Sequence, residues 1–231
     1  MIALAVGLMG VAVLRLRRTD RYVVMIGSVV LLALATPPIR TKFESSLPWH
    51  MASHVLVMFV VPLFLGWVVA QQSEAPARYP WLPALILNLV MVASHLPRVF
   101  NFVMTHGFWA AELMNLIFCV SGLWFFVCIW RTSTPLRWSI FSVVGTMAVM
   151  LFLAMAMSIF SATPWYSSMA SMPGMSMASD FSSQQLAAAI LWICGDIWAV
   201  PTLVVLIRRL VEREGSLLNV VQRYSEPPSL R

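Results

Sequence analysis

The stretch PWHMASHVLVMFVVPLFLGWVVA, residues 48–70, decides the fold because it is almost wholly apolar and contains no Asp, Glu, Lys or Arg. A helix crosses the hydrocarbon core of a bilayer with about 20 mostly apolar residues, so this stretch is long enough to span. Its apolar residues are continuous instead of alternating, which favours a helix over a membrane β-strand. The stretch therefore predicts a transmembrane helix.

The rest of the chain has the same character. Of its 231 residues, 60% are hydrophobic and only 10% are charged, whereas a soluble domain has about 25% charged residues. Six further apolar runs are separated by short polar breaks, at residues 1–14, 22–35, 81–96, 108–130, 138–160 and 184–207. We predict an all-α, polytopic transmembrane bundle of about seven spans over residues 1–210, followed by a polar tail at 211–231.

The basic residues are sorted between the two sides of this predicted bundle. Most lie in the breaks after the first, third and fifth runs and in the tail, while Arg40, Lys42 and Arg98 lie on the other side. The positive-inside rule then predicts an outer N-terminus and a cytoplasmic C-terminus. The basic residues of the first run come after its apolar stretch, whereas those of a signal peptide come before it, so we expect a retained helix. Because the basic residues lie at the ends of the apolar runs, the net charge of +6 does not indicate a nucleic-acid partner.

All four histidines fall near the predicted outer face. His50 and His54 open the run at 48–70 with a spacing that places both imidazoles on one helical face, about 6 Å apart. His95 ends the fourth run, and His106 precedes the fifth. The pair at His50 and His54 predicts a two-point clamp for a metal ion, with a hydrogen-bonded helix cap as the alternative for a single histidine.

Methionine recurs in the predicted outer loop between the last two runs. This polar, Ser-rich stretch at 161–183 contains Met169, Met172, Met175 and Met177. Core methionines fill gaps, but these have nothing obvious to pack against. Thioether and imidazole together suit copper, and thioether selects Cu(I). We therefore expect copper contact here, with a loop that dips into lipid as the alternative.

Polar side chains inside the runs are further candidates for function. Asp196 lies deep in the last run, and a membrane-embedded carboxylate is costly unless it has a functional or hydrogen-bonding role. Asn88, Glu112 and Asn115 are candidates to join helices by hydrogen bonds. Glu112, near the predicted outer end of the fifth run, is also a candidate to orient a histidine ligand. No Ser-His-Asp order, phosphate loop or dinucleotide glycine motif occurs, so no enzyme is predicted.

Four segments resemble, in order, the bacterial cytochrome c oxidase assembly factors of the CtaG type. They are HMASHVLVM at 50–58 with Pro62 and Leu65-Gly66 after it, His95-Leu96-Pro97, LMNLIF at 113–118, and QQLA at 184–187 with Leu191-Trp192 after it. These are similar to the family's HMxxHxLLM opening, its His-Leu-Pro, its LEHLLF stretch and its DQQLAG-x-x-MW helix. The resemblance covers about residues 45–212. Asn115 stands where the family usually has histidine, and Ser183 where it has aspartate.

The resemblance implies a role in maturing a respiratory oxidase. The family is polytopic and is implicated in delivering or inserting copper, so His50, His54 and His95 are expected to bind copper at the outer face of the bacterial inner membrane. Glu112, His106 and Asn115 are expected beside them; the expected partners are the bilayer and oxidase subunits.

Two other functions stay open from the sequence. One is a noncatalytic accessory or structural subunit of a respiratory or other membrane complex. The other is a transporter that uses Asp196 as an ion or proton site, although the paired broken helices and internal symmetry of many transporters are not evident.

Overall fold

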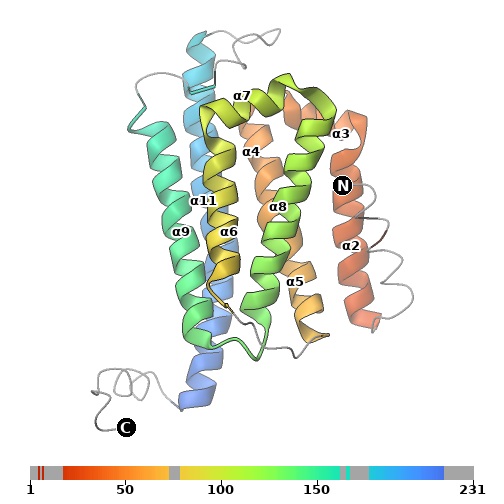
Figure 1. Ribbon diagram of the computed structural model, residues 1–231, viewed down its shortest axis with the longest axis vertical. Coiled ribbons are helices and arrows are strands. Elements are labelled where there is room, and N and C mark those ends of the chain that lie inside the picture. Colours follow the sequence, from red (N-terminus) through yellow and green to blue (C-terminus); the bar gives the residue numbers. More distant parts are fainter. Residues whose placement is uncertain are drawn as a thin grey trace.

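The computed structural model describes residues 5, 7, 18–72, 79–161, 165–166 and 177–215, and these residues form helices and no strand. The helices are α2 (Arg18–Ala35), α3 (Pro37–Glu44), α4 (Leu47–Val55), η1 (Leu56–Val60), α5 (Val61–Gln71), α6 (Leu82–His95), α7 (Pro97–Thr105), α8 (Gly107–Trp130), α9 (Leu136–Ser158) and α11 (Met177–Glu214). They stand side by side as a bundle, with α7 across one end (Figure 1). The all-α prediction is confirmed for this part of the chain.

The predicted number of spans is confirmed only in part. Four helical segments are long and apolar enough to cross a membrane, at Leu47–Gln71, Gly107–Trp130, Leu136–Ser158 and Phe181–Arg213, and two bent pairs raise the number to six at most. The predicted run at 1–14 falls outside the described residues, except for Ala5 and Gly7. The polar loop predicted to reach residue 183 ends earlier, because α11 already begins at Met177.

Prolines create the two bent pairs. Thr36 precedes Pro37 and Leu96 precedes Pro97, and both have extended backbone, with ψ of 140° and 132°. Proline disfavours helical geometry in the residue before it but is well accepted in the first turn of a new helix. The chain therefore bends by 76° between α2 and α3 and by 72° between α6 and α7. The runs predicted at 22–35 and 81–96 are consequently too short to span without the helix that follows.

A third proline, Pro62, is associated with a wider helical turn in the span that contains the histidine pair. In a regular α-helix the amide of residue 62 would donate to the carbonyl of Met58, but Pro62 has no amide hydrogen. The helix takes a π turn at Leu56–Val60, and the amide of Val61 donates to the carbonyl of Leu56. Such π turns often occur at functional sites.

Two glycines bring this span into close contact with α8. A Cβ atom on Gly122 would collide with the carbonyl oxygen of Met58, and one on Gly66 would lie 2.6 Å from the Cβ of Phe126. Small residues allow helix backbones to approach closely inside a membrane. The contact between Gly122 and Met58 lies one helical turn from both Phe118 and His54, so it sets the distance across the site described below.

The core is closed by α11, which packs against α9 and α4. Its Trp198 stacks on Phe59 of η1, with ring centroids 4.8 Å apart. On the opposite side, the Asn88 side chain of α6 donates to the hydroxyl of Thr146 on α9 at 3.1 Å. Asn88 therefore joins two helices, as its place in an apolar run led us to expect.

Candidate metal centre

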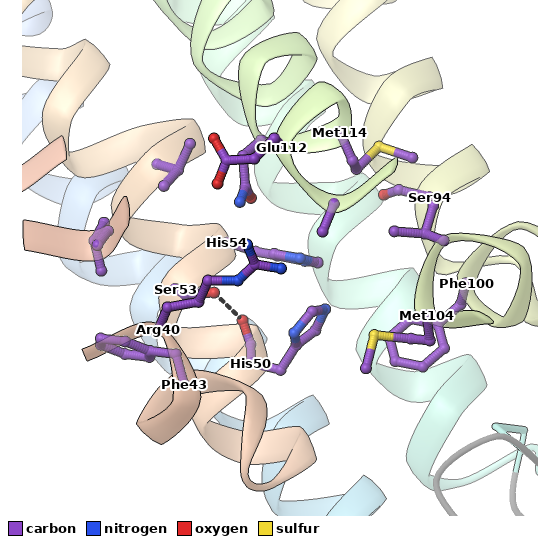
Figure 2. Close-up of a pocket in the computed structure, with 15 residues that line it drawn as sticks. Arg40, Phe43, His50, Ser53, His54, Ser94, Phe100, Met104, Glu112 and Met114 are labelled. Carbon is purple, nitrogen blue, oxygen red and sulfur yellow. Dashed lines mark hydrogen bonds between the residues drawn. The ribbon is translucent and has the colours of Figure 1, made fainter. Parts of the chain in front are cut away.

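The structure brings three of the four histidines together near the α7 end of the bundle. His50 and His54 come from α4, and their ring centroids are 4.3 Å apart. His95, the last residue of α6, has its ring centroid 5.8 Å from that of His54. His54 and His95 are buried, with 7% and 1% of their surface exposed. Figure 2 shows His50 and His54 side by side in the cleft between the helices.

The hydrogen bonds of His95 fix which ring nitrogen carries the proton. Its Nδ1 lies 2.7 Å from the carbonyl oxygen of Met91, one turn back on α6. A carbonyl only accepts, so Nδ1 donates, and the Nε2 of the neutral ring keeps its lone pair. That Nε2 lies 3.2 Å from the Sδ atom of Met51. A thioether has no hydrogen to donate, so two lone pairs face each other inside a buried site.

This separation suits two ligands of one metal ion. Metal–nitrogen and metal–sulfur bonds are about 2.0 and 2.3 Å long for an ion such as zinc, so ligands at roughly a right angle lie about 3 Å apart. The imidazole of His95 is already oriented by the Met91 carbonyl, which is the usual arrangement behind a histidine ligand. The geometry of His95 and Met51 therefore fits a soft ion between them.

His54 adds an unsatisfied nitrogen next to this pair. In the described part of the chain its Nδ1 is buried and has no hydrogen-bond partner. A buried polar atom without a partner costs about 1–3 kcal/mol, so it requires an explanation. The edge-to-face contact of the His54 ring with Phe118, at 4.6 Å between centroids, holds the ring without satisfying that nitrogen. A bound ion would satisfy it.

The cleft beside the histidines has a volume of about 50 Å³, which is room for an ion and one or two small ligands such as water. His50 and His54 form part of its wall, together with Arg40 of α3. The remaining wall that matters for ligand chemistry comes from α7 and α8, and consists of Met104, Glu112, Met114 and Asn115. The cleft thus combines imidazole, thioether and carboxylate groups at one place (Figure 2).

Histidines alone do not complete the site. Within the described ranges, no three His, Cys, Asp or Glu side chains are grouped closely enough to hold a metal ion by themselves. The Nε2 atom of His95 faces the Sδ atom of Met51. The ligand set that the fold offers is therefore mixed, with imidazole nitrogen and thioether sulfur.

The other predicted residues lie in different places. Glu112 and Asn115 line the cleft. His106 is exposed at the corner between α7 and α8, with its Nδ1 2.8 Å from the Phe102 carbonyl. Asp196 lies on an exposed face of α11. Of the methionines of the predicted loop, Met169, Met172 and Met175 lie outside the described residues, as does the side chain of Met177.

Sequence reasoning missed three methionines of this centre. Met51 lies between His50 and His54 in the sequence, and Met104 and Met114 lie in apolar helices. In each case the local pattern resembles that of an ordinary core methionine, which fills gaps between helices. Met51 becomes a candidate ligand only when the fold brings it to His95, 44 residues away.

A comparison with protein families connects this fold to an assembly process. The model of the family described as cytochrome c oxidase caa3 assembly factor (Caa3_CtaG) matches residues 66–213. The chain belongs to this family. As a member of the caa3 oxidase assembly factor family it is an apolar helical membrane protein, and the family's role indicates association with cytochrome oxidase. The matched range includes His95 but begins after His50 and His54. No curated protein and no solved structure matches the chain.

Proposed function

We propose that this assembly factor holds Cu(I) at the buried centre of His95, Met51 and His54 and releases it to cytochrome c oxidase during assembly. The observation that carries the proposal is the contact between the unprotonated Nε2 of His95 and the Sδ of Met51. The unsatisfied Nδ1 of His54 supports it independently. Copper is the cargo in this proposal, and the role of the protein is accessory and noncatalytic.

The chemistry of the ligands favours Cu(I) over harder ions. Thioether sulfur is a soft ligand that selects Cu(I), whereas calcium and magnesium take oxygen ligands. All three side chains are neutral ligands, and burying a charge costs more as the charge rises. A monovalent ion is therefore the easiest metal to accommodate among buried, uncharged groups.

We infer that an ion would enter through the cleft, because His54 of the centre lines its wall together with His50. Met104 and Met114 place two more thioethers on the wall of the cleft that His50 also lines. An ion could pass from these ligands to His50 and then to the inner ligands by exchanging one soft donor at a time. The histidine that the family usually carries at position 115 is asparagine here, and the neighbouring Met114 supplies a thioether to the cleft. The predicted topology places this entrance at the periplasmic face.

The decisive experiment measures Cu(I) binding to the purified chain in detergent, under anaerobic conditions, against a chromophoric Cu(I) chelator. Wild type is expected to take up a stoichiometric amount of Cu(I). The variant His54→Ala/His95→Ala is expected to bind at least about a hundredfold more weakly, because two of the three proposed ligands are lost outright, whereas loss of supporting groups costs 10- to 100-fold. Two outcomes contradict the proposal: wild type without copper above the buffer background, and an equal loss in the control His106→Ala, whose ring lies outside the cleft.

One observation favours the alternative of a structural subunit in a membrane complex. Asp196 is exposed in the middle of a membrane-spanning helix, among exposed apolar side chains such as Ile193 and Ile197. A charged group that faces lipid is costly, so this face is better suited to a partner helix. This alternative predicts that the chain co-purifies with a partner after mild solubilisation, and that Asp196→Leu weakens the association. Recovery of the chain alone would count against it.

A further inference from the structure

A hollow lined by arginines lies at the opposite end of the bundle from the histidines. It has a volume of about 270 Å³ and is formed by the turn between α8 and α9 and by the C-terminal end of α11. We name it the arginine hollow, after Arg131, Arg209 and Arg213; its other lining residues are Thr132, Thr134, Leu136 and Glu212. Figure 1 shows these helix ends together, far from α7.

Two tryptophan rings contact the guanidinium of Arg209. The Cζ atom of Arg209 lies 5.3 Å from the ring centroid of Trp67 and 5.5 Å from that of Trp130. Among the described residues, the one acidic side chain that lines the hollow, Glu212, forms its ion pair with Arg208 at 2.8 Å. Cation–π contacts orient a guanidinium but leave its charge in place. The arginine hollow therefore keeps an excess of positive charge.

Its donors match a phosphate group. A guanidinium presents planar, paired N–H groups that bind phosphate oxygens with two parallel hydrogen bonds. Arg213 already reaches the α8–α9 turn, where it donates to the carbonyl of Thr132 at 3.5 Å. Thr132 and Thr134 also line the hollow at this turn. Arg209 and Arg213 line the same hollow, so their positive charges repel each other, and a bound anion would relieve that repulsion.

The surroundings indicate that the phosphate belongs to a lipid. The hollow lies where membrane-spanning helices end, and Trp67 and Trp130 occupy the level at which interfacial tryptophans lie. Phe64 and Val205, one turn nearer the middle of the bundle, are exposed apolar side chains against which acyl chains can pack. Basic pockets between helix ends on the cytoplasmic side suit anionic headgroups. The predicted topology places the arginine hollow on that side.

We propose that the arginine hollow binds the phosphate headgroup of an anionic phospholipid. Arg209 and Arg213 supply the contacts from α11. Binding would tie the end of α11 to that turn and fix the depth of the bundle in the membrane. The site is independent of the metal centre, which lies at the other end of the same helices.

Native mass spectrometry of the delipidated full-length chain in detergent tests the proposal. The probes are phosphatidylglycerol, phosphatidylcholine with the same acyl chains, and inorganic phosphate. We expect tighter binding of phosphatidylglycerol than of phosphatidylcholine. Arg209→Gln/Arg213→Gln should weaken phosphatidylglycerol binding about thirtyfold, since each basic residue near an anionic surface contributes about a factor of five. Arg137→Gln, which removes an exposed arginine outside the hollow at the same end, should leave binding unchanged.

Three results would overturn the proposal: equal binding of the two lipids, a comparable loss in Arg137→Gln, and full displacement of phosphatidylglycerol by millimolar inorganic phosphate, which would assign the hollow to a free anion. Because Arg209→Gln can loosen the packing of two tryptophans, Arg213→Gln alone is measured beside it, with thermal unfolding as a check on folding. Arg213 is exposed and leaves those indole contacts intact.

Discussion

The two ends of the bundle use aromatic rings in opposite ways. At the metal centre, Phe118 and Phe100 meet the imidazoles of His54 and His50 in edge-to-face contacts, at 4.6 and 5.4 Å. At the arginine hollow, Trp67 and Trp130 lie near the guanidinium of Arg209. The first arrangement surrounds neutral donors with apolar rings, and the second supports a permanent charge. At the metal centre the proposed ligands are neutral before the cation binds, whereas the arginine hollow carries its positive charge before any anion binds.

The strongest test of this contrast is Gly122→Ala. The added Cβ would collide with the Met58 carbonyl, so α8 must move away from η1, the π turn that directly follows the histidine helix α4. Overpacking of this kind costs about 1–3 kcal/mol, and the upper part of that range applies when the obstacle is backbone. We expect a lower thermal unfolding midpoint and weaker Cu(I) binding, with phosphatidylglycerol binding retained.

Gly145→Ala is the matched control for that variant. Gly145 lies in the middle of α9, and a Cβ there would meet nothing within 4 Å. Alanine is the better helix former, so stability should stay equal or rise slightly. If both variants lost the same stability, the close approach of α8 would not be what holds the metal centre together.

Met51→Leu tests the sulfur ligand while keeping the size and apolarity of the side chain. We expect Cu(I) affinity to fall about tenfold, equivalent to about 1.4 kcal/mol, with little change in stability because this swap nearly conserves volume. Copper competition measures the first effect and thermal unfolding the second. Met147→Leu on α9, outside the cleft, should change neither. Unchanged copper affinity in Met51→Leu would remove the thioether from the ligand set.

The smallest expected effect comes from Tyr166→Phe. The buried Tyr166 hydroxyl donates to the carbonyl of His95 at 3.2 Å, and burial raises the pKa of this tyrosine. Loss of this hydrogen bond should cost about 1 kcal/mol of unfolding free energy.

Because the folded-state pKa of Tyr166 is raised, its contribution is fully present below the usual tyrosine pKa of about 10 and declines above it. The Tyr166→Phe variant should therefore lose less stability than wild type at alkaline pH. Tyr22→Phe, at an exposed position, serves as the control. Identical pH profiles of wild type and Tyr166→Phe would show that this hydroxyl contributes nothing there.

The sequence predicted what depends on local pattern. Continuous apolar runs placed the helices, and the i,i+4 spacing placed His50 and His54 on one face because that relation is internal to a helix. Counting spans was less successful, since composition alone cannot tell a full crossing from a short helix that bends at Pro37 or Pro97. The contact of His95 with Met51 could not be predicted, because it depends on tertiary packing that brings together two residues 44 positions apart in the chain.

The π turn at Leu56–Val60 sets the direction in which the side chains of α4 point relative to those of α5. Each residue added to or removed from a helix turns everything beyond it by about 100°. Deleting one residue within the turn would leave α5 seated on α8 through Gly66, yet it would swing Met51 and His54 around the helix axis and away from His95. Both halves of the span would keep their composition, but the ligand atoms of Met51, His54 and His95 would no longer face one common position. The number of residues between His54 and Pro62 is therefore as much a determinant of the metal centre as the donors themselves.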